Sequence, residues 1–154
     1  MKKVLLVIDL QPMFAITPYY SKIINYITNH SAEYDVVYAT RFIVKRDTPF
    51  VNHLGYEKKF KKEVLEFPYN VLIGKDSYEL ERGYCDKWLK DCDVTIIGYG
   101  TNSNILATCF RLFEYGVKFQ VYGKYCYSRE GNKVHENALE IIEKNFGIGS
   151  VIRK

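Results

Sequence analysis

The sequence has no apolar run long enough to cross a membrane. The run at the N-terminus, Val4 to Ile8, ends at Asp9 after five residues, whereas a spanning helix needs about 20. It is also shorter than the apolar region of a secretory signal peptide, which has roughly 7–15 residues. These lengths predict a cytoplasmic protein that has no membrane partner.

The sequence also has few metal-binding and disulfide-forming residues. Its four cysteines, at positions 85, 92, 109 and 126, form no Cys-x-x-Cys pair, and its three histidines, at 30, 53 and 135, lie far apart. Metal sites need closely spaced ligands. We therefore expect free thiols in a reducing compartment, no metal and no other cofactor.

A large excess of charge is missing as well. The chain has 22 basic and 18 acidic residues, for a formal net charge of +4. Nucleic-acid-binding domains carry a stronger basic footprint. The densest basic stretch, residues 58–62, is followed by Glu63 and Glu66, which favours a solvated helix face over a nucleic-acid site.

What the chain does contain is a regular alternation of apolar runs and segments with helical period. The 154 residues suit one domain, residues 1–154. Alternation of this kind predicts an α/β protein, a three-layer Rossmann-like sandwich with a mostly parallel six-stranded sheet flanked by helices. The expected strands are residues 4–9, 35–41, 70–73, 94–98, 118–122 and 151–153.

Helices are expected between these strands. Thr17 and Pro18 suit the cap and first position of one helix, Cys85 to Cys92 share a helical face, and Val134, Ala138, Ile141 and Ile142 form the apolar face of the last helix. The irregular stretch from Phe42 to Tyr56 predicts a long loop. Long loops in compact domains are often functional.

Polar residues at the carboxyl ends of the predicted strands are the first candidates for a site, because ligands bind at that edge of a parallel sheet. Asp9 ends the first apolar run, and Lys75 follows the strand at residues 70–73. The segment Gly98 to Asn104 follows the strand at residues 94–98. A carboxylate at such a place suits general acid or base catalysis, although it also suits a turn cap.

These segments carry a family resemblance. Val4 to Gln11 resembles the first strand of the isochorismatase-like hydrolases, which delivers a catalytic aspartate just before a glutamine. Gly98 to Thr108 resembles that family's Gly-x-x-Thr-Asp-x-Cys-Val-x-x-Thr signature. Lys75, Gly116 and His135 fall at further family positions. The resemblance implies a catalytic aspartate at Asp9 and a catalytic lysine at Lys75.

The sequence departs from the family at Asn104, which occupies the position of the nucleophilic cysteine. An amide nitrogen has a delocalised lone pair and is not a usable nucleophile. Cys109, five residues further along the helix, points about 140° away, and Cys126 suits core packing. We therefore expect neither thiol to replace the missing nucleophile.

Two main hypotheses remain open at this point. The first is a hydrolase of a small molecule, acting on a vinyl ether or an amide, with Asp9 as general acid or base, Lys75 as its electrostatic partner and Asn104 orienting water or substrate. The second is an inactive binding protein with the same pocket. The expected substrate contacts are Gln11, Phe14, Gly100, Thr101 and Tyr78. Relatives commonly assemble, which implies a homodimer or a larger homo-oligomer, and assembly as the chain's main task is a weaker third hypothesis.

Overall fold

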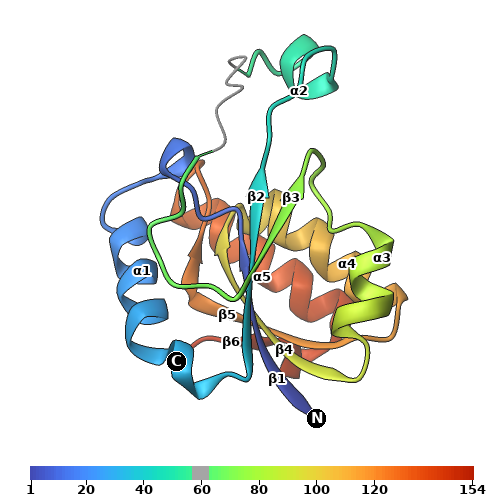
Figure 1. Cartoon of the computed structure of the whole chain (residues 1–154). Coiled ribbons are helices and arrows are strands. Elements are labelled where there is room, and N and C mark those ends of the chain that lie inside the picture. The colour runs from blue at the N-terminus through green and yellow to red at the C-terminus, as the bar shows by residue number, and fades with distance from the viewer. Residues whose placement is uncertain (57–62) are drawn as a thin grey trace.

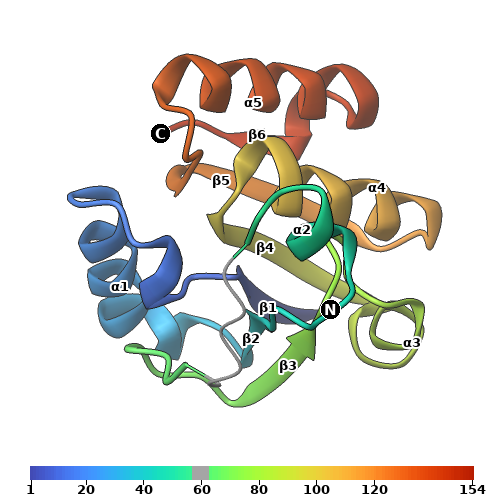
Figure 2. The ribbon, with the colours of Figure 1, turned by 90° about the horizontal axis from the view of Figure 1, so that it is seen from above.

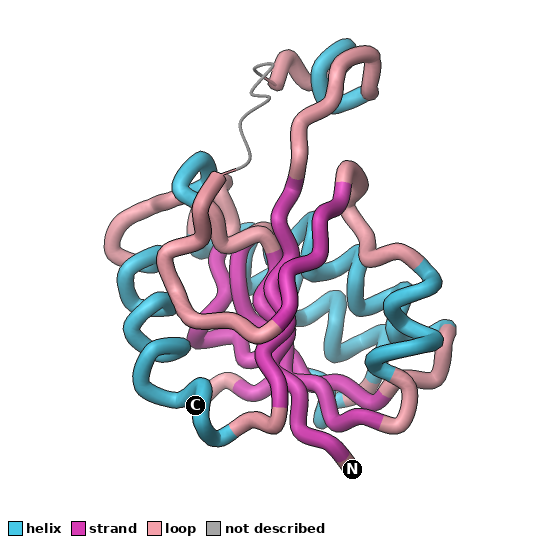
Figure 3. The backbone as a smooth tube through the Cα atoms, viewed as in Figure 1, coloured by secondary structure: helices cyan, strands magenta, loops and turns pink. Residues whose placement is uncertain are grey.

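A computed structural model describes residues 1–56 and 63–154. Its six strands form one sheet in the order β3-β2-β1-β4-β5-β6, and every neighbouring pair is parallel. Figures 1 and 3 show the strands running through the centre of the molecule. The strands are β1 (Lys2–Ile8), β2 (Val36–Phe42), β3 (Val71–Lys75), β4 (Cys92–Tyr99), β5 (Lys118–Tyr127) and β6 (Val151–Ile152).

Helices cover both faces of this sheet, which confirms the expected α/β sandwich. Helix α1 (Tyr19–His30) lies on one face, whereas α3 (Arg82–Tyr84), α4 (Leu106–Glu114) and α5 (Asn132–Phe146) lie on the other (Figure 2). Each face has its own apolar core. Leu5 and Val7 pack with Ile23 of α1, while Leu6 and Ile8 belong to the core that α4 and α5 cover.

The centre of the sheet is closely packed at Gly98. A Cβ atom at this position would lie 2.2 Å from the carbonyl oxygen of Ile8, and the φ angle of Gly98 is +129°. Only glycine adopts this conformation without strain and leaves room for the neighbouring strand. The end of β1, which precedes Asp9, is therefore held against β4.

Two strands extend at least two residues beyond their predicted carboxyl ends. Strand β3 continues through Gly74 and Lys75, so Lys75 ends this strand instead of following it. Strand β5 runs to Tyr127 because its pairing with β4 resumes after an irregularity between Ile96 and Gly98. Cys126 therefore lies inside β5. The apolar pattern did not reveal these extensions because polar residues interrupt both strands.

The predicted helices need three corrections. Helix α1 begins at Tyr19 with Pro18 at its cap, and Thr17 is not the cap. The turn after α3 ends at Leu89, so Cys92 opens β4. The buried face of α5 includes His135 and Leu139, whereas Ile141 is 43% exposed. The basic stretch 58–62 lies outside the described residues.

The stretch from Phe42 to Tyr56 projects beyond the strand ends and contains the short helix α2 (Pro49–Asn52) (Figure 1). Its base is joined to β3, because the Ile43 amide donates to the Lys75 carbonyl at 2.8 Å and Lys45 pairs with Asp76 at 2.8 Å. No helix in the described ranges is long and apolar enough to span a bilayer.

Candidate active site

The candidate site lies at the carboxyl edge of the sheet, where β1, β3 and β4 end. Asp9 directly follows β1, Lys75 is the last residue of β3, and Asn104 lies in the turn between β4 and α4. Asp9 has a φ angle of +44°, which turns the chain sharply out of the strand. The parallel order β3-β2-β1-β4 brings these residues together although 95 positions separate Asp9 from Asn104.

The Asp9 carboxylate is the centre of the site and is fully buried. Its Oδ2 atom accepts from Lys75 Nζ at 2.7 Å and from Asn104 Nδ2 at 2.5 Å. Its Oδ1 atom accepts from the Thr40 hydroxyl at 2.7 Å. A buried charge needs such partners. Three donors from three different elements therefore fix the orientation of this carboxylate.

The Lys75 ammonium is held as firmly as the carboxylate. Besides Asp9, it donates to the backbone carbonyls of Ser77 and Tyr78 at 2.8 and 2.9 Å. An ammonium group has three protons, so each one has an acceptor. The ammonium also lies 5.8 Å from the centre of the Phe42 ring. The side chain of Lys75 is 1% exposed and points its charge into the site.

Asn104 has one consistent orientation in this network. Because an ionised carboxylate only accepts hydrogen bonds, the amide nitrogen must face Asp9. The amide oxygen then accepts from the Ser103 hydroxyl at 2.9 Å. Asn104 thus links the Asp9–Lys75 pair to the turn that leads into α4.

The turn that positions Asn104 is unusually wide. The Ile105 amide donates to the Gly100 carbonyl at 2.9 Å, five residues back, and π-turns of this kind occur frequently at functional sites. Gly100 has a φ angle of +82°, and a Cβ atom there would lie 2.9 Å from Asn104 Oδ1. Glycine at this position therefore leaves space beside the amide.

Two of the predicted substrate contacts direct their side chains to protein partners. Gln11 donates to the Phe42 carbonyl at 3.1 Å and accepts from the Phe42 amide at 2.6 Å, which joins the chain after β1 to the end of β2. The Thr101 hydroxyl is 2.8 Å from His135 Nδ1 of α5. Both residues shape the site, and their contact with a substrate stays a prediction.

Phe14 and Tyr78, the two aromatic residues among the predicted contacts, belong to a wall of rings beside the charged cluster. Phe14 stacks on Tyr99 with ring centres 4.4 Å apart. Phe42 contacts Phe50 at 4.8 Å, and Phe50 contacts Tyr78 at 4.9 Å. Ring faces suit a flat small molecule. Phe50 comes from the projecting stretch, which therefore contributes to the surroundings of the site.

The structure places two candidate thiols away from this chemistry. Cys109 and Cys126 are buried in the core on the α4 and α5 side. Burial raises the pKa of Cys126 to about 12 and that of Cys109 well above its usual range. Thiolates are the reactive form of cysteine. Both residues therefore pack the core, as the sequence predicts.

Sequence reasoning missed Thr40 and Ser103. Thr40 is a fully buried polar residue within β2, and its hydroxyl both donates to the Asp9 carboxylate and accepts from the Asp9 amide at 2.9 Å. A hydroxyl near the end of an apolar strand was the available signal. Ser103 gave none, because serine is common in turns.

Asp47 and His53, two side chains of types that bind metal ions, both lie in the projecting stretch. Among the described residues no group of three histidine, cysteine, aspartate or glutamate side chains is arranged to hold a metal ion.

Comparison with known proteins places this geometry in a fold. Neither a family model nor a curated protein matches the sequence, but solved structures match nearly the whole chain. A nicotinamidase from Bacillus subtilis is 18% identical, with a TM-score of 0.75 over 99% of this chain and 100% of that one. An isochorismatase-like hydrolase from Alkaliphilus metalliredigens is 15% identical, with a TM-score of 0.80 over 98% and 94%.

The chain has the isochorismatase-like fold. A pyrazinamidase of Pyrococcus horikoshii in complex with zinc supports this further, at 20% identity and a TM-score of 0.76 over the full length of both chains. Identities in this range show a shared fold alone. Within the isochorismatase-like fold, the chemistry of this chain has to be argued from its own residues.

Proposed function

We propose that this protein is a hydrolase of a small molecule that works without a cysteine nucleophile, with Asp9 as general acid or base and Lys75 as its electrostatic partner. The observation that carries the proposal is the buried ion pair between Asp9 and Lys75, 2.7 Å apart at the carboxyl edge of the sheet. Burying two charges costs folding free energy unless their partners compensate for it. Such a pair at a ligand-binding edge favours a catalytic use.

The hydrogen bonds leave one place where Asp9 can act. A carboxylate has about four lone-pair positions. Two on Oδ2 face Lys75 and Asn104, and one on Oδ1 faces Thr40. The second position on Oδ1 is the one we assign to proton transfer with a substrate or a water molecule.

For a vinyl ether, the protonated form of Asp9 gives its proton to the terminal carbon of the double bond, and water adds to the resulting cation. The hemiketal then separates into a ketone and an alcohol, and the proton released from water restores the acid. For an amide, the ionised form of Asp9 takes a proton from water as it attacks the carbonyl carbon, and the amine leaves with that proton. Asn104 orients the water or the substrate in either case.

A second candidate function is favoured by Asn104 itself. Its amide bonds to Asp9 and Ser103 at once, so it closes a network at the position where the family resemblance places a nucleophile. A protein with this arrangement binds a flat small molecule between the aromatic rings and turns nothing over. A small-molecule ligand is common to both functions, and assembly into homo-oligomers stays a prediction.

Turnover by the wild-type protein and by Asp9→Asn tests the proposal. The test compounds are isochorismate, which is a vinyl ether, and two amides, nicotinamide and pyrazinamide. The amides are chosen because the structural neighbours are named nicotinamidase and pyrazinamidase. If Asp9 transfers a proton, Asp9→Asn lowers the rate by at least about 100-fold. The rates are measured by chromatography of the products. Equal rates in the wild-type protein and in Asp9→Asn reject the proposal that this protein is a hydrolase.

Asp93→Asn is the matched control. Asp93 pairs with Lys118 at 3.5 Å near the start of β4, at the opposite edge of the sheet, and its side chain is 39% exposed. Loss of one carboxyl charge there leaves the rate unchanged. If the wild-type protein turns over none of the three compounds but binds one of them in calorimetry, the binding function replaces the hydrolase.

A further inference from the structure

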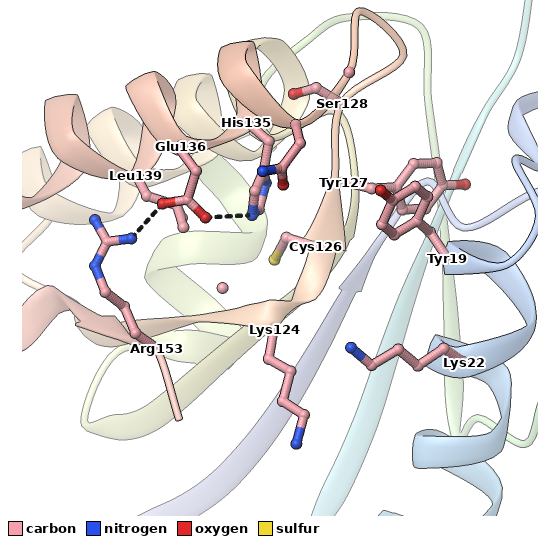
Figure 4. Close-up of a pocket in the computed structure, with 13 residues that line it drawn as sticks. Tyr19, Lys22, Lys124, Cys126, Tyr127, Ser128, His135, Glu136, Leu139 and Arg153 are labelled. Carbon is pink, nitrogen blue, oxygen red and sulfur yellow. Dashed lines mark hydrogen bonds and ion pairs between the residues drawn. The ribbon is translucent and has the colours of Figure 1, made fainter.

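A cavity lies between α1, β5 and α5, away from the charged cluster of the candidate active site. Its volume is about 220 Å³. None of Asp9, Lys75 and Asn104 lines it. Figure 4 shows His135 and Glu136 pointing from α5 toward β5, while Lys22 extends from α1 toward the same strand. The cavity is therefore built from three elements that close around one space.

The lining carries more positive than negative charge. Three cations, Lys22, Lys124 and Arg153, line the cavity with a single carboxylate, Glu136. Arg153 is paired with that carboxylate at 2.6 Å. In the part of the chain that the structure describes, Lys22 and Lys124 have no carboxylate partner, and each lies against the Tyr125 ring. Two ammonium groups therefore remain to attract an anion.

His135 adds a buried hydrogen-bonding group to the wall. The residue is 8% exposed. Its Nδ1 atom is bonded to Thr101, and its Nε2 atom lies 3.8 Å from Glu136, beyond hydrogen-bond distance. Nδ1 accepts the Thr101 hydroxyl proton in the tautomer that carries its own proton on Nε2. In that tautomer the Nε2–H faces the Glu136 carboxylate on the wall of the cavity.

The remaining walls are apolar or aromatic. The rings of Tyr19 and Tyr127 lie nearly parallel, with centres 6.0 Å apart and planes inclined by 13°. Leu139 and Cys126 are buried in the core on the α5 side, and Gly123 contributes no side chain. The space is smaller than the roughly 300–1,000 Å³ of sites for drug-sized molecules. It suits a compact ligand with a flat apolar part.

We propose that this cavity is a binding site for a small planar carboxylate, such as an aromatic acid. The carboxylate group lies toward the Lys22 and Lys124 ammonium groups, which share the Tyr125 ring, and the flat apolar part lies against the rings of Tyr19 and Tyr127. The walls also contact the turn that carries Asn104, because Ser128 donates to Asn102 at 2.8 Å and His135 bonds Thr101. A bound acid thus touches the support of the candidate active site without entering it.

Benzoate and its neutral counterpart benzamide test this site on the full chain by two-dimensional amide NMR titration. Benzoate is expected to shift the resonances of residues 126–128 and 132–136 in a saturable way, and benzamide to bind at least about tenfold more weakly. Equal binding of the two compounds overturns the proposal. So do benzoate shifts centred on Asp9 and Asn104, or a failure to saturate below about 10 mM.

The double variant Lys22→Gln/Lys124→Gln locates the anion. Both lysines are exposed, so the variant is expected to fold, and it should weaken benzoate binding about tenfold. Lys87→Gln removes an exposed charge from the turn at residues 85–89, which contributes nothing to the cavity, and should leave binding unchanged. Unchanged binding in the double variant, or an equal loss in Lys87→Gln, rejects the assignment.

Discussion

Asn104 shows how one residue decides which mechanism a site can use. Its amide is within hydrogen-bond distance of Asp9 and is carried by the first turn before α4. Helix starts favour negative charge because their amide groups and dipole point toward it. A thiol at this position would therefore have a neighbouring carboxylate as its base and a helix start that favours the thiolate. The amide of Asn104 has no proton that such a base removes readily and forms no comparable nucleophile.

Asn104→Cys is accordingly expected to create a reactive thiol. In the wild-type protein all four cysteines are buried, and burial raises the pKa of Cys85 to about 11, so a short iodoacetamide pulse should label none of them. The variant should gain one label, identified at position 104 by peptide mass spectrometry, together with amidase activity toward nicotinamide. An unlabelled variant with native circular dichroism contradicts the expectation that Asp9 and the helix start activate a thiol at position 104.

The ion pair also has a consequence for stability. Lys75→Met leaves the Asp9 carboxylate buried without its ammonium partner, which costs roughly 3–5 kcal/mol of the free energy of unfolding. Lys118→Met removes a cation from the exposed pair with Asp93 and should cost less than about 1 kcal/mol. Urea unfolding monitored by fluorescence measures both values.

The double variant Asp9→Asn/Lys75→Met separates coupling from packing. Because it removes both charges, it should be more stable than Lys75→Met alone. If the double variant loses the sum of the two single effects, Asp9 and Lys75 do not stabilise one another, and the ion pair cannot carry the argument for catalysis.

For individual residues, the sequence revealed the charged side chains of the site but not the hydrogen-bond partners that orient the site. Asp9 was recognisable because it ends an apolar run, and Lys75 because it follows one. Thr40 was marked only by a hydroxyl near the end of an apolar strand, and Ser103 had no sequence signal that tells a ligand of another side chain from an ordinary turn residue. The direction of the Gln11 side chain toward Phe42 depends on where β2 ends, which the local pattern does not contain.

Contacts between elements depend on residues whose burial the local pattern does not show. The sequence placed Val134 and Ile141 on the inner face of α5, whereas His135 and Leu139 lie there. The error arises because a histidine was counted as polar. Its ring fills space and bonds Thr101 at 2.8 Å, and this bond joins α5 to the turn that carries Asn104.

This contact predicts a pH dependence of stability. Burial lowers the pKa of His135 from its ordinary value near 6.5. Two smaller effects act on the same pKa: Glu136 raises it, and Arg153 lowers it further. The unfolded chain therefore binds a proton at a higher pH than the folded chain. Stability from neutral His135 is present above about pH 6.5 and is lost as the pH falls toward its lower folded pKa.

His135→Gln isolates this contribution, because glutamine keeps a hydrogen-bonding group and does not titrate. Between pH 7.5 and 5, about the range around the ordinary histidine pKa, the wild-type free energy of unfolding should fall more steeply than that of the variant. Urea titrations at intervals across this range give both slopes. Parallel slopes in the two proteins contradict a buried neutral His135.

For the whole molecule, the fold class follows from the alternation of strands and helices more readily than from any single strand, whereas the order of the strands was not predicted. A parallel sheet with crossover helices was predictable because the pattern repeats along the chain. The length of β5 and the projection that carries α2 were not, because they depend on pairing across the sheet and on contacts such as Lys45 with Asp76.

The four cysteines provide a probe of how the molecule unfolds as a unit. Cys85, Cys92, Cys109 and Cys126 all belong to the same apolar core, on one face of the sheet. They come from the turn after α3, from two strands and from α4. If this core opens cooperatively, as single domains of about this size usually do, the thiols become accessible together.

We therefore expect labelling with excess N-ethylmaleimide to convert unlabelled protein directly into a fourfold-labelled form in intact-mass spectra, without abundant intermediates. A fast reagent makes the rate report the opening of the core. The variant Lys87→Cys adds one exposed thiol and should acquire a single label at once, before the same cooperative step. Accumulation of wild-type protein with one label, mapped to Cys92 at the start of β4, would instead show that this edge of the sheet opens on its own. The core would then consist of units that open separately, and the charged cluster at the opposite edge would owe its rigidity to its own hydrogen bonds.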